Sequence, residues 1–408
     1  MDLKKFQPWL VWGIADLYFI LAVTETILFG ALAPDLQKQL HLTKTELGLM
    51  GSALFLSFGA TQLITGSLFD TLGPRLTLAF SACVAACGFF FLSHAENLSQ
   101  AIGAQIVIGA GLSTSYVGAL YLASMWFSKE RFSLLSGLTQ MSASIVSASL
   151  LVLMALLGAV EANFRDILFD FSLVTLFMGG LLFLIVRKSP EANLKKEKDP
   201  KKGSFWEELK QIFRIPQFWL GVGFFSSNIG AFLAFSSLWN IPGSIAYGRT
   251  LQIATLLSAT LRYGGALGAL LAGVFASYFS NCSLIARLYS SGALVMGLIL
   301  VYGPTYPLAV IFLIFAVLGF FFGGSALGFP LVSEHIPPHL KGTGFGMMVA
   351  FGYLLSALLE YVIGVLLSLA SESRYLEATN AFRIALTPLV IALLLGCVST
   401  FWLKESKN

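Results

Sequence analysis

Residues 66–75 read Gly66-Ser67-Leu68-Phe69-Asp70-Thr71-Leu72-Gly73-Pro74-Arg75, a short turn between two long apolar runs. The two glycines allow a tight turn and close contact between the helices on either side of it. The carboxylate of Asp70 and the cation of Arg75 can pair with other charges or face a helix end. The stretch therefore predicts a loop that joins two membrane spans and carries a charged contact.

Apolar runs like these two fill nearly the whole chain. Of its 408 residues, 57% are hydrophobic and 11% are charged, whereas an ordinary soluble domain has about 25% charged residues. This composition excludes a conventional soluble enzyme. A run of about 20 apolar residues is long enough to cross a bilayer as a helix. We expect twelve spans, at about 8–32, 48–69, 74–93, 101–127, 132–158, 165–187, 216–243, 251–280, 284–303, 307–333, 343–369 and 381–403.

Basic residues are concentrated on one side of this predicted topology. Residues 187–214 hold nine Lys or Arg against five Asp or Glu, which accounts for the whole net charge of +4. Cytoplasmic loops of membrane proteins are rich in Lys and Arg. This distribution places both termini in the cytoplasm and the protein in a lipid bilayer, and it does not indicate a nucleic-acid partner.

The chain divides into two similar halves around the basic segment. Pro8-Trp9-Leu10 recurs as Pro216 with Trp219-Leu220, and Gly66 recurs as Gly273. Matches at a nearly constant offset indicate duplicated bundles, although Gly and Trp can also match by chance in an apolar chain. We predict an N-terminal six-helix bundle at 1–188, a cytoplasmic linker with an amphipathic segment at 189–215, and a C-terminal six-helix bundle at 216–408.

The turn at 66–75 resembles the Gly-x-Leu-Ala-Asp-Arg-x-Gly-Arg-Lys signature of the major facilitator superfamily. The resemblance implies an all-α membrane protein with twelve transmembrane helices in two pseudo-symmetric six-helix bundles. It also implies that the turn acts as a conformational latch. Thr71 and Pro74 replace two basic positions of the signature. The implied latch residues are Gly66, Asp70, Gly73 and Arg75, with Arg131 as the outside partner of Asp70.

A second stretch narrows the resemblance. Residues 126–140 resemble the intraphagosomal nutrient transporters of intracellular Gram-negative bacteria, a branch that imports amino acids and nucleosides and broadly includes siderophore-associated carriers. The Gly-Pro pair typical of drug antiporters is missing from 137–144, which counts against multidrug efflux. The resemblance implies a multi-pass protein of the bacterial inner membrane that functions as a monomer.

Ionisable side chains inside the predicted spans are candidates for the transport pathway. Each costs roughly 2.5 to 3.5 kcal/mol to insert and therefore usually faces protein or water. Asp16, Glu25 and Glu360 are candidates for proton coupling. Asp16 and Glu25 are nine residues apart, about half a turn around the helix, so we prefer Glu25 and keep Asp16 as its rival. The alternative for each acid is a buried structural partner.

Substrate binding is predicted on polar side chains of the central helices. Gln140 and Ser144 share one face of the fifth span, and Ser258 and Arg262 share one face of the eighth. Interhelical hydrogen bonding is the alternative for the small residues, and a permanent salt bridge to an acid is the alternative for Arg262. The full predicted set is Arg262, Tyr18, Tyr116, Gln140, Ser144, Asn228, Trp239, Asn240 and Ser258.

The sequence contains no recognisable nucleotide-binding loop, metal-ligand cluster or activated nucleophile, so we expect no cofactor, no metal and no ATP-driven step. The leading hypothesis is proton-coupled uptake of a small carboxylate-bearing nutrient, because membrane carboxylates can bind protons and an arginine can anchor an anion. The alternatives are a carrier for a carboxylate siderophore in either direction, and a non-transporting receptor on the same fold. An intramembrane enzyme is disfavoured.

Overall fold

The computed structural model describes residues 3–127, 129–157, 163–187, 205–279, 281–333, 335–337, 340–372 and 377–404, and all the regular structure in these ranges is helical. The N-terminal half contains α1 (Leu3–Gln39), α2 (Lys44–Thr71), α3 (Gly73–Ser93), α4 (Leu98–Leu112), α5 (Thr114–Trp126), α6 (Lys129–Leu156) and α7 (Phe164–Ile185). The C-terminal half contains α9 (Phe205–Phe213), α10 (Pro216–Ala234), η3 (Phe235–Trp239), α11 (Asn240–Ala246), α12 (Leu251–Phe279), α13 (Cys282–Tyr302), α14 (Leu308–Phe322), η4 (Gly323–Leu327), α15 (Gly328–Ser333), α16 (Lys341–Glu372), α17 (Ala378–Ala385) and α18 (Thr387–Trp402).

These helices make twelve spans, as predicted. Four spans are broken into consecutive pieces, namely α4 with α5, α10 with η3 and α11, α14 with η4 and α15, and α17 with α18. Among the described residues, eleven stretches are apolar and long enough to cross a membrane. The twelfth span is α12, which is 29 residues long and whose hydropathy is lowered by Arg262 and several hydroxyl side chains. The first span was predicted at 8–32, but α1 continues to Gln39 because its polar last turns extend beyond the apolar run.

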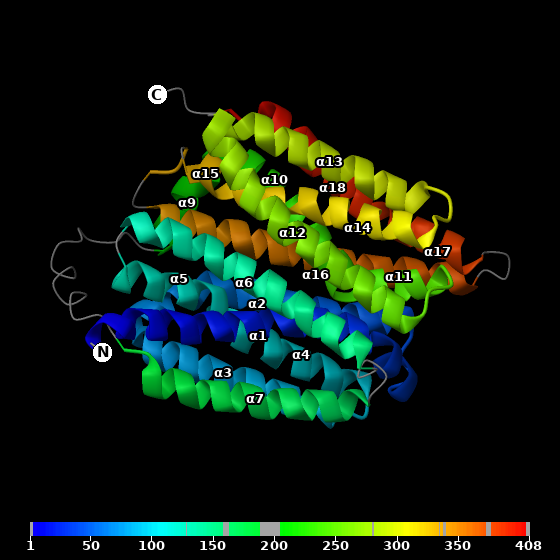
Figure 1. Cartoon of the computed structure of the whole chain (residues 1–408), viewed down its shortest axis with the longest axis horizontal. Helices are drawn as coiled ribbons and strands as arrows, with labels where there is room; N and C mark the ends of the chain where they lie inside the picture. Colours follow the sequence, from blue (N-terminus) through cyan, green and yellow to red (C-terminus); the bar gives the residue numbers. More distant parts are fainter. Residues whose placement is uncertain are drawn as a thin grey trace.

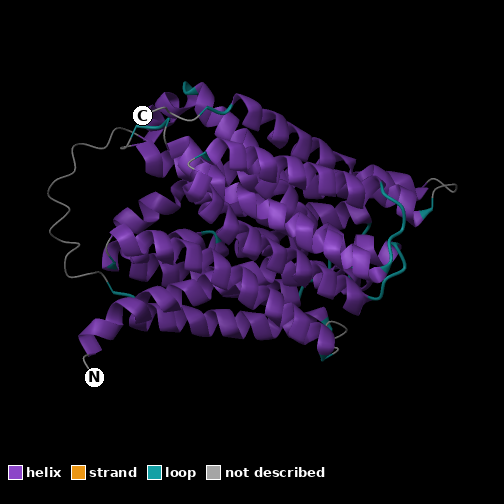
Figure 2. Ribbon diagram, turned by 45° about the horizontal axis from the view of Figure 1, so that its top comes forward, coloured by secondary structure: helices purple, strands orange, loops and turns teal. Residues whose placement is uncertain are grey.

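Two bundles lie side by side with their helices roughly parallel to one long axis (Figure 1). Helices α1–α7 form one bundle and α10–α18 form the other. Both chain ends lie at the same end of the molecule, which we call the terminal end. The opposite end, called the distal end, carries the turns at 40–43 and 303–307. Figure 2 shows that the described residues are helical apart from short loops and turns. Most of the predicted linker 189–215 lies outside the described residues, and its described part includes α9.

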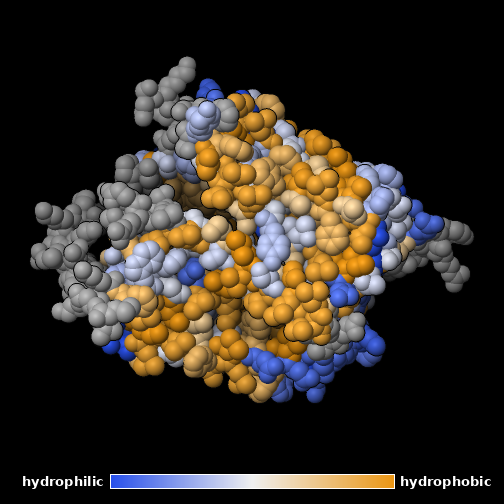
Figure 3. Space-filling view, in the orientation of Figure 1, coloured by the Kyte–Doolittle hydropathy of each residue, from blue (hydrophilic) through white to orange (hydrophobic). Residues whose placement is uncertain are grey.

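The face of both bundles that Figure 3 shows is largely apolar. Large hydrophobic side chains stand far out of the protein, including Phe80 at 69%, Phe177 at 67% and Leu395 at 61% exposure. A monomeric soluble protein rarely exposes contiguous apolar patches of this kind, whereas lipid tails solvate them. The surface therefore fits a bilayer, with the polar side chains turned toward the interior or the two ends.

The bundles are held together mainly by two helix pairs, α2 with α16 and α6 with α12. Near the distal end α6 and α12 are joined by a hydrogen bond from Gln252 Nε2 to the Ala155 carbonyl at 3.1 Å, and α2 and α16 are tightly packed. A Cβ atom added to Gly364 would lie 2.6 Å from the carbonyl oxygen of Lys44, and one added to Gly48 would lie 2.5 Å from the carbonyl oxygen of Glu360. The Thr45 backbone N–H also donates to Ser368 Oγ at 2.9 Å. Small residues here let the two backbones approach closely.

The same four helices separate toward the terminal end. On each of the four helices, one glycine near this end has no neighbouring atom within 4 Å of the position that a Cβ would occupy. These glycines are Gly66, Gly137, Gly273 and Gly346. A recess between the bundles is visible on this side in Figure 3. The interface is therefore closed at the distal end and open at the terminal end.

Candidate functional site

Arg262 lies in the middle of α12 with only 3% of its surface exposed. Its Nη2 donates a hydrogen bond to Ser236 Oγ at 3.0 Å, and its guanidinium carbon lies 5.1 Å from the centre of the Phe232 ring. Its Nε is buried and has no hydrogen-bond partner in the described structure. A buried cation without a counter-charge is unfavourable, so this site can bind an anion.

The salt-bridge alternative for Arg262 is not seen in the structure. Among the described residues, none of Asp16, Glu25 and Glu360 forms an ion pair with its guanidinium. The anion that would neutralise Arg262 is therefore not supplied by these acids in this arrangement of the helices.

Two tyrosines complete the surroundings of Arg262. Tyr353 of α16 lies within electrostatic range of both Arg262 and Tyr116 of α5. The Tyr353 ring stacks on Phe58 of α2, with 4.1 Å between the ring centres. We call Arg262, Tyr353, Tyr116, Phe58 and Phe232 the central cluster. It draws side chains from both bundles, so a molecule bound there would contact each of them.

Sequence reasoning did not place Tyr353 in the substrate site. The available signal was its position seven residues before Glu360, which puts the two on one face of α16. Phe58 gave no signal, because an aromatic residue in a membrane helix is more often a packing residue.

Glu360 lies on α16 where that helix meets α2 of the other bundle. Ser237 Oγ donates a hydrogen bond to its Oε1, and Trp239 Nε1 donates to its backbone carbonyl at 3.2 Å. Its Oε2 is buried without a hydrogen-bond partner in the described structure. Gly51 of α2 faces this oxygen so closely that a Cβ there would collide with it. The carboxyl group thus sits inside the closed distal interface.

Glu25 approaches the same region from α1. It is 3% exposed, and its Oε2 has no hydrogen-bond partner among the described residues. It lines a small apolar cavity with Phe29 and several leucines. Phe29, one helical turn after Glu25, lies beside the same glycine of α2 as Glu360, so Glu25 comes within electrostatic range of Glu360. Two carboxyl groups from different bundles therefore lie in the same region, which the sequence could not show because 335 residues separate them.

Asp16 lies apart from this acid pair. Its Oδ2 accepts a hydrogen bond from Ser142 Oγ at 2.9 Å, which connects α1 to α6 inside the N-terminal bundle. Its Oδ1 is buried without a partner in the described structure. The nine-residue spacing from Glu25 had predicted that the two acids face different ways, and their different neighbours agree with this.

Two predicted substrate residues lie inside single bundles instead of between them. The Tyr18 hydroxyl donates to the Gly111 carbonyl at 2.9 Å within the N-terminal bundle. Asn228 Nδ2 donates to the Phe224 carbonyl at 2.9 Å and to Ser290 Oγ at 3.3 Å within the C-terminal bundle. These bonds give both side chains a packing role, and we leave them out of the proposed site.

The remaining predicted residues lie near the interface. Gln140 is exposed and Ser144 is half-buried on α6, on the helix pair that opens toward the terminal end. Trp239 is bonded to Glu360, as described above. Asn240 Nδ2 donates to Ser258 Oγ at 3.0 Å, and both residues are buried. The predicted set is therefore split between the open part of the interface and its closed distal part.

A π-helical turn, η3 at Phe235–Trp239, connects these groups. It supplies Ser236 to Arg262 and Ser237 to Glu360. π-Turns within α-helices are rare and occur often at functional sites. Nothing in the residues 235–239 distinguishes them from an ordinary helix, so the sequence did not reveal it.

The predicted latch is only partly described. Gly73 has φ of +78°, a conformation that glycine adopts without strain. Arg75 Nε donates to the Phe183 carbonyl at 2.5 Å, and its guanidinium lies 4.1 Å from the Phe183 ring centre, so Arg75 binds α7 of its own bundle. The side chains of Asp70 and Arg131 lie outside the described residues, and their pairing stays a prediction.

Two helical bundles that are closed at one end, open at the other, and meet around buried polar groups define a membrane transporter of the alternating type. Residues 16–359 match the Major Facilitator Superfamily. The chain belongs to this family and is a transporter, not an enzyme.

Relatives share the fold at low identity. The uncharacterized MFS-type transporter YceJ of Bacillus subtilis (strain 168) is 23% identical over 82% of this chain and 83% of its own. The probable L-galactonate transporter of Escherichia coli (strain K12) is 25% identical over 58% of this chain and 54% of its own. The chain spans about half the length of several curated relatives that it matches. A crystal structure of a D-xylose–proton symporter superposes with a TM-score of 0.71 at 14% identity, covering 98% of both chains.

Proposed function

We propose that the chain is a proton-coupled importer of a small carboxylate-bearing nutrient, such as an amino acid, across the bacterial inner membrane. The observation that carries this proposal is Arg262, a buried guanidinium with an unpartnered Nε and no ion pair among the described residues. A guanidinium stays charged at any physiological pH and presents a planar fork that matches a carboxylate. The substrate would supply the missing anion.

Alternating access follows from the two ends of the interface. With both termini in the cytoplasm, the open terminal end faces inward and the packed distal end faces outward. A substrate bound at the central cluster contacts Tyr116 and Phe58 of one bundle and Arg262 and Tyr353 of the other. Rocking of the bundles about this cluster would expose it to each side in turn.

Proton coupling is assigned to the Glu25 and Glu360 pair. Both carboxyl groups are buried, Glu360 in the distal interface and Glu25 beside a small cavity of the N-terminal bundle, and each has an unpartnered Oε2 in the described structure. Two charged carboxylates repel each other at short range. A proton on this pair relieves the repulsion when the distal end closes, and opening that end would expose the pair to water. Closure and protonation are thereby linked.

The relatives agree with this class of substrate and coupling. The probable L-galactonate transporter and the probable sulfoacetate transporter SauU of Cupriavidus necator are named for organic anions. The superposed structure is that of a D-xylose–proton symporter. Their sequence identities to this chain lie between 14% and 25%, so they support the class of solute and not a particular molecule.

A thermal-shift screen of the purified protein tests the anion anchor. Amino acids, nucleosides and carboxylate siderophores are compared, and a ligand at 100 times its Kd stabilises the folded state by about 2.7 kcal/mol. We expect stabilisation by a carboxylate-bearing compound. Arg262→Lys keeps the charge but loses the fork, so affinity should fall about tenfold or more with little change in the unliganded melting temperature.

Arg262→Ala separates binding from folding. If Arg262 mainly stabilises the bundle, for example through its hydrogen bond to Ser236, this variant melts at a lower temperature than the wild type. If it binds substrate, the variant folds and loses the ligand-induced shift. An Arg262→Ala protein that folds well and binds the carboxylate ligand with unchanged affinity contradicts the proposal.

A further inference from the structure

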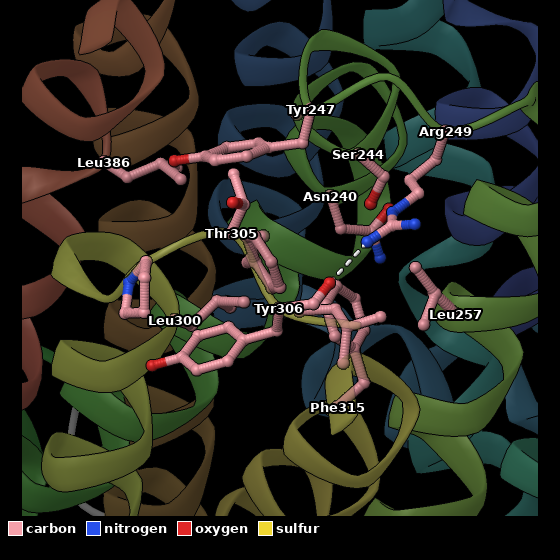
Figure 4. A pocket seen from close by; sticks show the side chains of 14 residues that line it. Asn240, Ser244, Tyr247, Arg249, Leu257, Leu300, Thr305, Tyr306, Phe315 and Leu386 are labelled. Atoms are coloured by element: carbon pink, nitrogen blue, oxygen red, sulfur yellow. Dashed lines mark hydrogen bonds between the residues drawn. The ribbon is translucent and has the colours of Figure 1, made fainter. Parts of the chain in front are cut away.

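A second cavity lies at the distal end of the C-terminal bundle, away from the central cluster (Figure 4). Its water-accessible volume is about 70 Å³, which is room for several water molecules, and it is open to solvent on one side. Phe235, Leu257 and Phe315 are buried and form its apolar floor, whereas Thr305 is exposed at its rim. The cavity is therefore entered from the aqueous phase at the distal end.

Polar groups gather on one side of this cavity. Figure 4 shows Arg249, Ser244 and Asn240 close together, facing the apolar residues. Arg249 Nη2 donates to the Tyr306 carbonyl at 2.6 Å, and this is the only hydrogen bond of its guanidinium among the described residues. Asn240 is 1% exposed, and its Oδ1 has no partner in the described structure. A cation and an unsatisfied acceptor thus face an apolar space.

We propose that this distal cavity binds a small aromatic carboxylate at a site separate from the central cluster. The guanidinium of Arg249 has N–H donors left for the carboxylate. An aromatic ring fits over the floor formed by Phe235, Leu257 and Phe315. A ligand that also carries an N–H group satisfies Asn240 Oδ1, whose present lack of a partner is unfavourable.

A ligand in this cavity also acts on the transport pathway through η3. Phe235, at the start of this turn, and Asn240, directly after it, line the cavity. Between them, Ser236 accepts a hydrogen bond from Arg262, and Ser237 donates one to Glu360. An occupant that holds this short segment in place stabilises the arrangement in which the distal interface is closed. The ligand is therefore expected to increase the population of that state.

Calorimetric titration of the full-length protein in lipid nanodiscs tests the site. The probe is indole-3-acetate, which has an aromatic body, a carboxylate and an N–H group, and its neutral analogue tryptophol is the ligand control. We expect indole-3-acetate to bind, tryptophol to bind at least tenfold more weakly, and Arg249→Gln to weaken indole-3-acetate at least tenfold. Binding is measured without transport, so the result does not depend on the proposed uptake activity.

Arg383→Gln is the matched protein control. Arg383 Nη2 donates to the Gly303 carbonyl at 2.8 Å, so it anchors the same loop as Arg249 without lining the cavity. We expect its affinity for the probe to stay within twofold of the wild type. Equal losses in both variants would mean that loop anchoring, not anion binding, is affected, and this overturns the proposal.

Two further variants locate the probe. Thr305→Trp places a large side chain at the exposed rim and should block binding while leaving the fold intact. Arg262→Gln should bind the probe normally. Loss of binding in Arg262→Gln with normal binding in Arg249→Gln and Thr305→Trp would place the probe in the central cluster and overturn the distal site, as would the absence of any binding by the wild type.

Discussion

The closed distal interface depends on the close approach of α2 and α16, and Gly364→Ala is designed to disturb it. The new Cβ would lie 2.6 Å from the carbonyl oxygen of Lys44 and 3.2 Å from the Cα of Gly48. An ordinary carbon–oxygen contact is about 3.3 Å or longer, so the two backbones must move apart by roughly 0.7 Å. Because both partners are backbone atoms, no side chain can rotate to make room.

The expected magnitude follows from this clash. Overpacking of a tight contact costs about 1 to 3 kcal/mol. The strain exists only when the distal end is closed, so the ratio of closed to open molecules should fall about 5- to 150-fold. Gly346→Ala is the control on the same helix, because nothing lies within 4 Å of its Cβ position. Each substitution adds the same helix stabilisation of roughly 0.5 to 1 kcal/mol, which cancels in the comparison.

Double electron–electron resonance measures the distance between two spin labels and thereby reports the fraction of molecules whose distal end is closed. Spin labels at Lys38→Cys and Glu377→Cys lie on exposed positions at the distal end of the two bundles, in a protein lacking its four native cysteines. We expect a longer distance to appear in Gly364→Ala and not in Gly346→Ala. The reasoning is refuted if Gly364→Ala keeps the wild-type distance distribution, or if both variants shift equally.

Two other substitutions test the remaining parts of the pathway. Glu360→Gln removes a titratable group but keeps the shape of the side chain. Uptake into vesicles should therefore no longer respond to a pH gradient, while substrate exchange continues. An unchanged pH response in both Glu360→Gln and Glu25→Gln would reject the role of the acid pair. Asp70→Asn should shift the balance between the two open states if the turn acts as a latch, with little effect on substrate affinity. Cysteine accessibility at the two cavity mouths measures that balance, and patterns identical to those of the wild type count against the latch.

The sequence predicted the spans well because their signal is local. Hydropathy and length define a membrane helix within about 20 residues, whatever it packs against. Arg262 was identified for the same reason, since a guanidinium deep in an apolar helix stands out alone. The structure adds that it has no acid partner among the described residues, which one helix cannot show.

The sequence could not predict which polar residues meet between the bundles. Tyr18 was predicted to bind substrate, yet its hydroxyl donates a hydrogen bond to the Gly111 carbonyl inside the N-terminal bundle, whereas Glu25 lies within electrostatic range of Glu360 of the other bundle. The two positions are only about 20° apart around the helix, so their different surroundings are decided by packing. The turn η3 and the distal cavity around Arg249 also arise from contacts between distant segments.

Uptake of labelled amino acids into proteoliposomes tests the central claim, that a proton gradient drives a carboxylate-bearing solute past Arg262. The medium outside the vesicles is made acidic, and the same preparation is measured with a protonophore and with Arg262→Ala. We expect uptake above that of protein-free liposomes, and we expect the protonophore and Arg262→Ala each to abolish this excess uptake. Uptake that persists unchanged with the protonophore and in Arg262→Ala would contradict it.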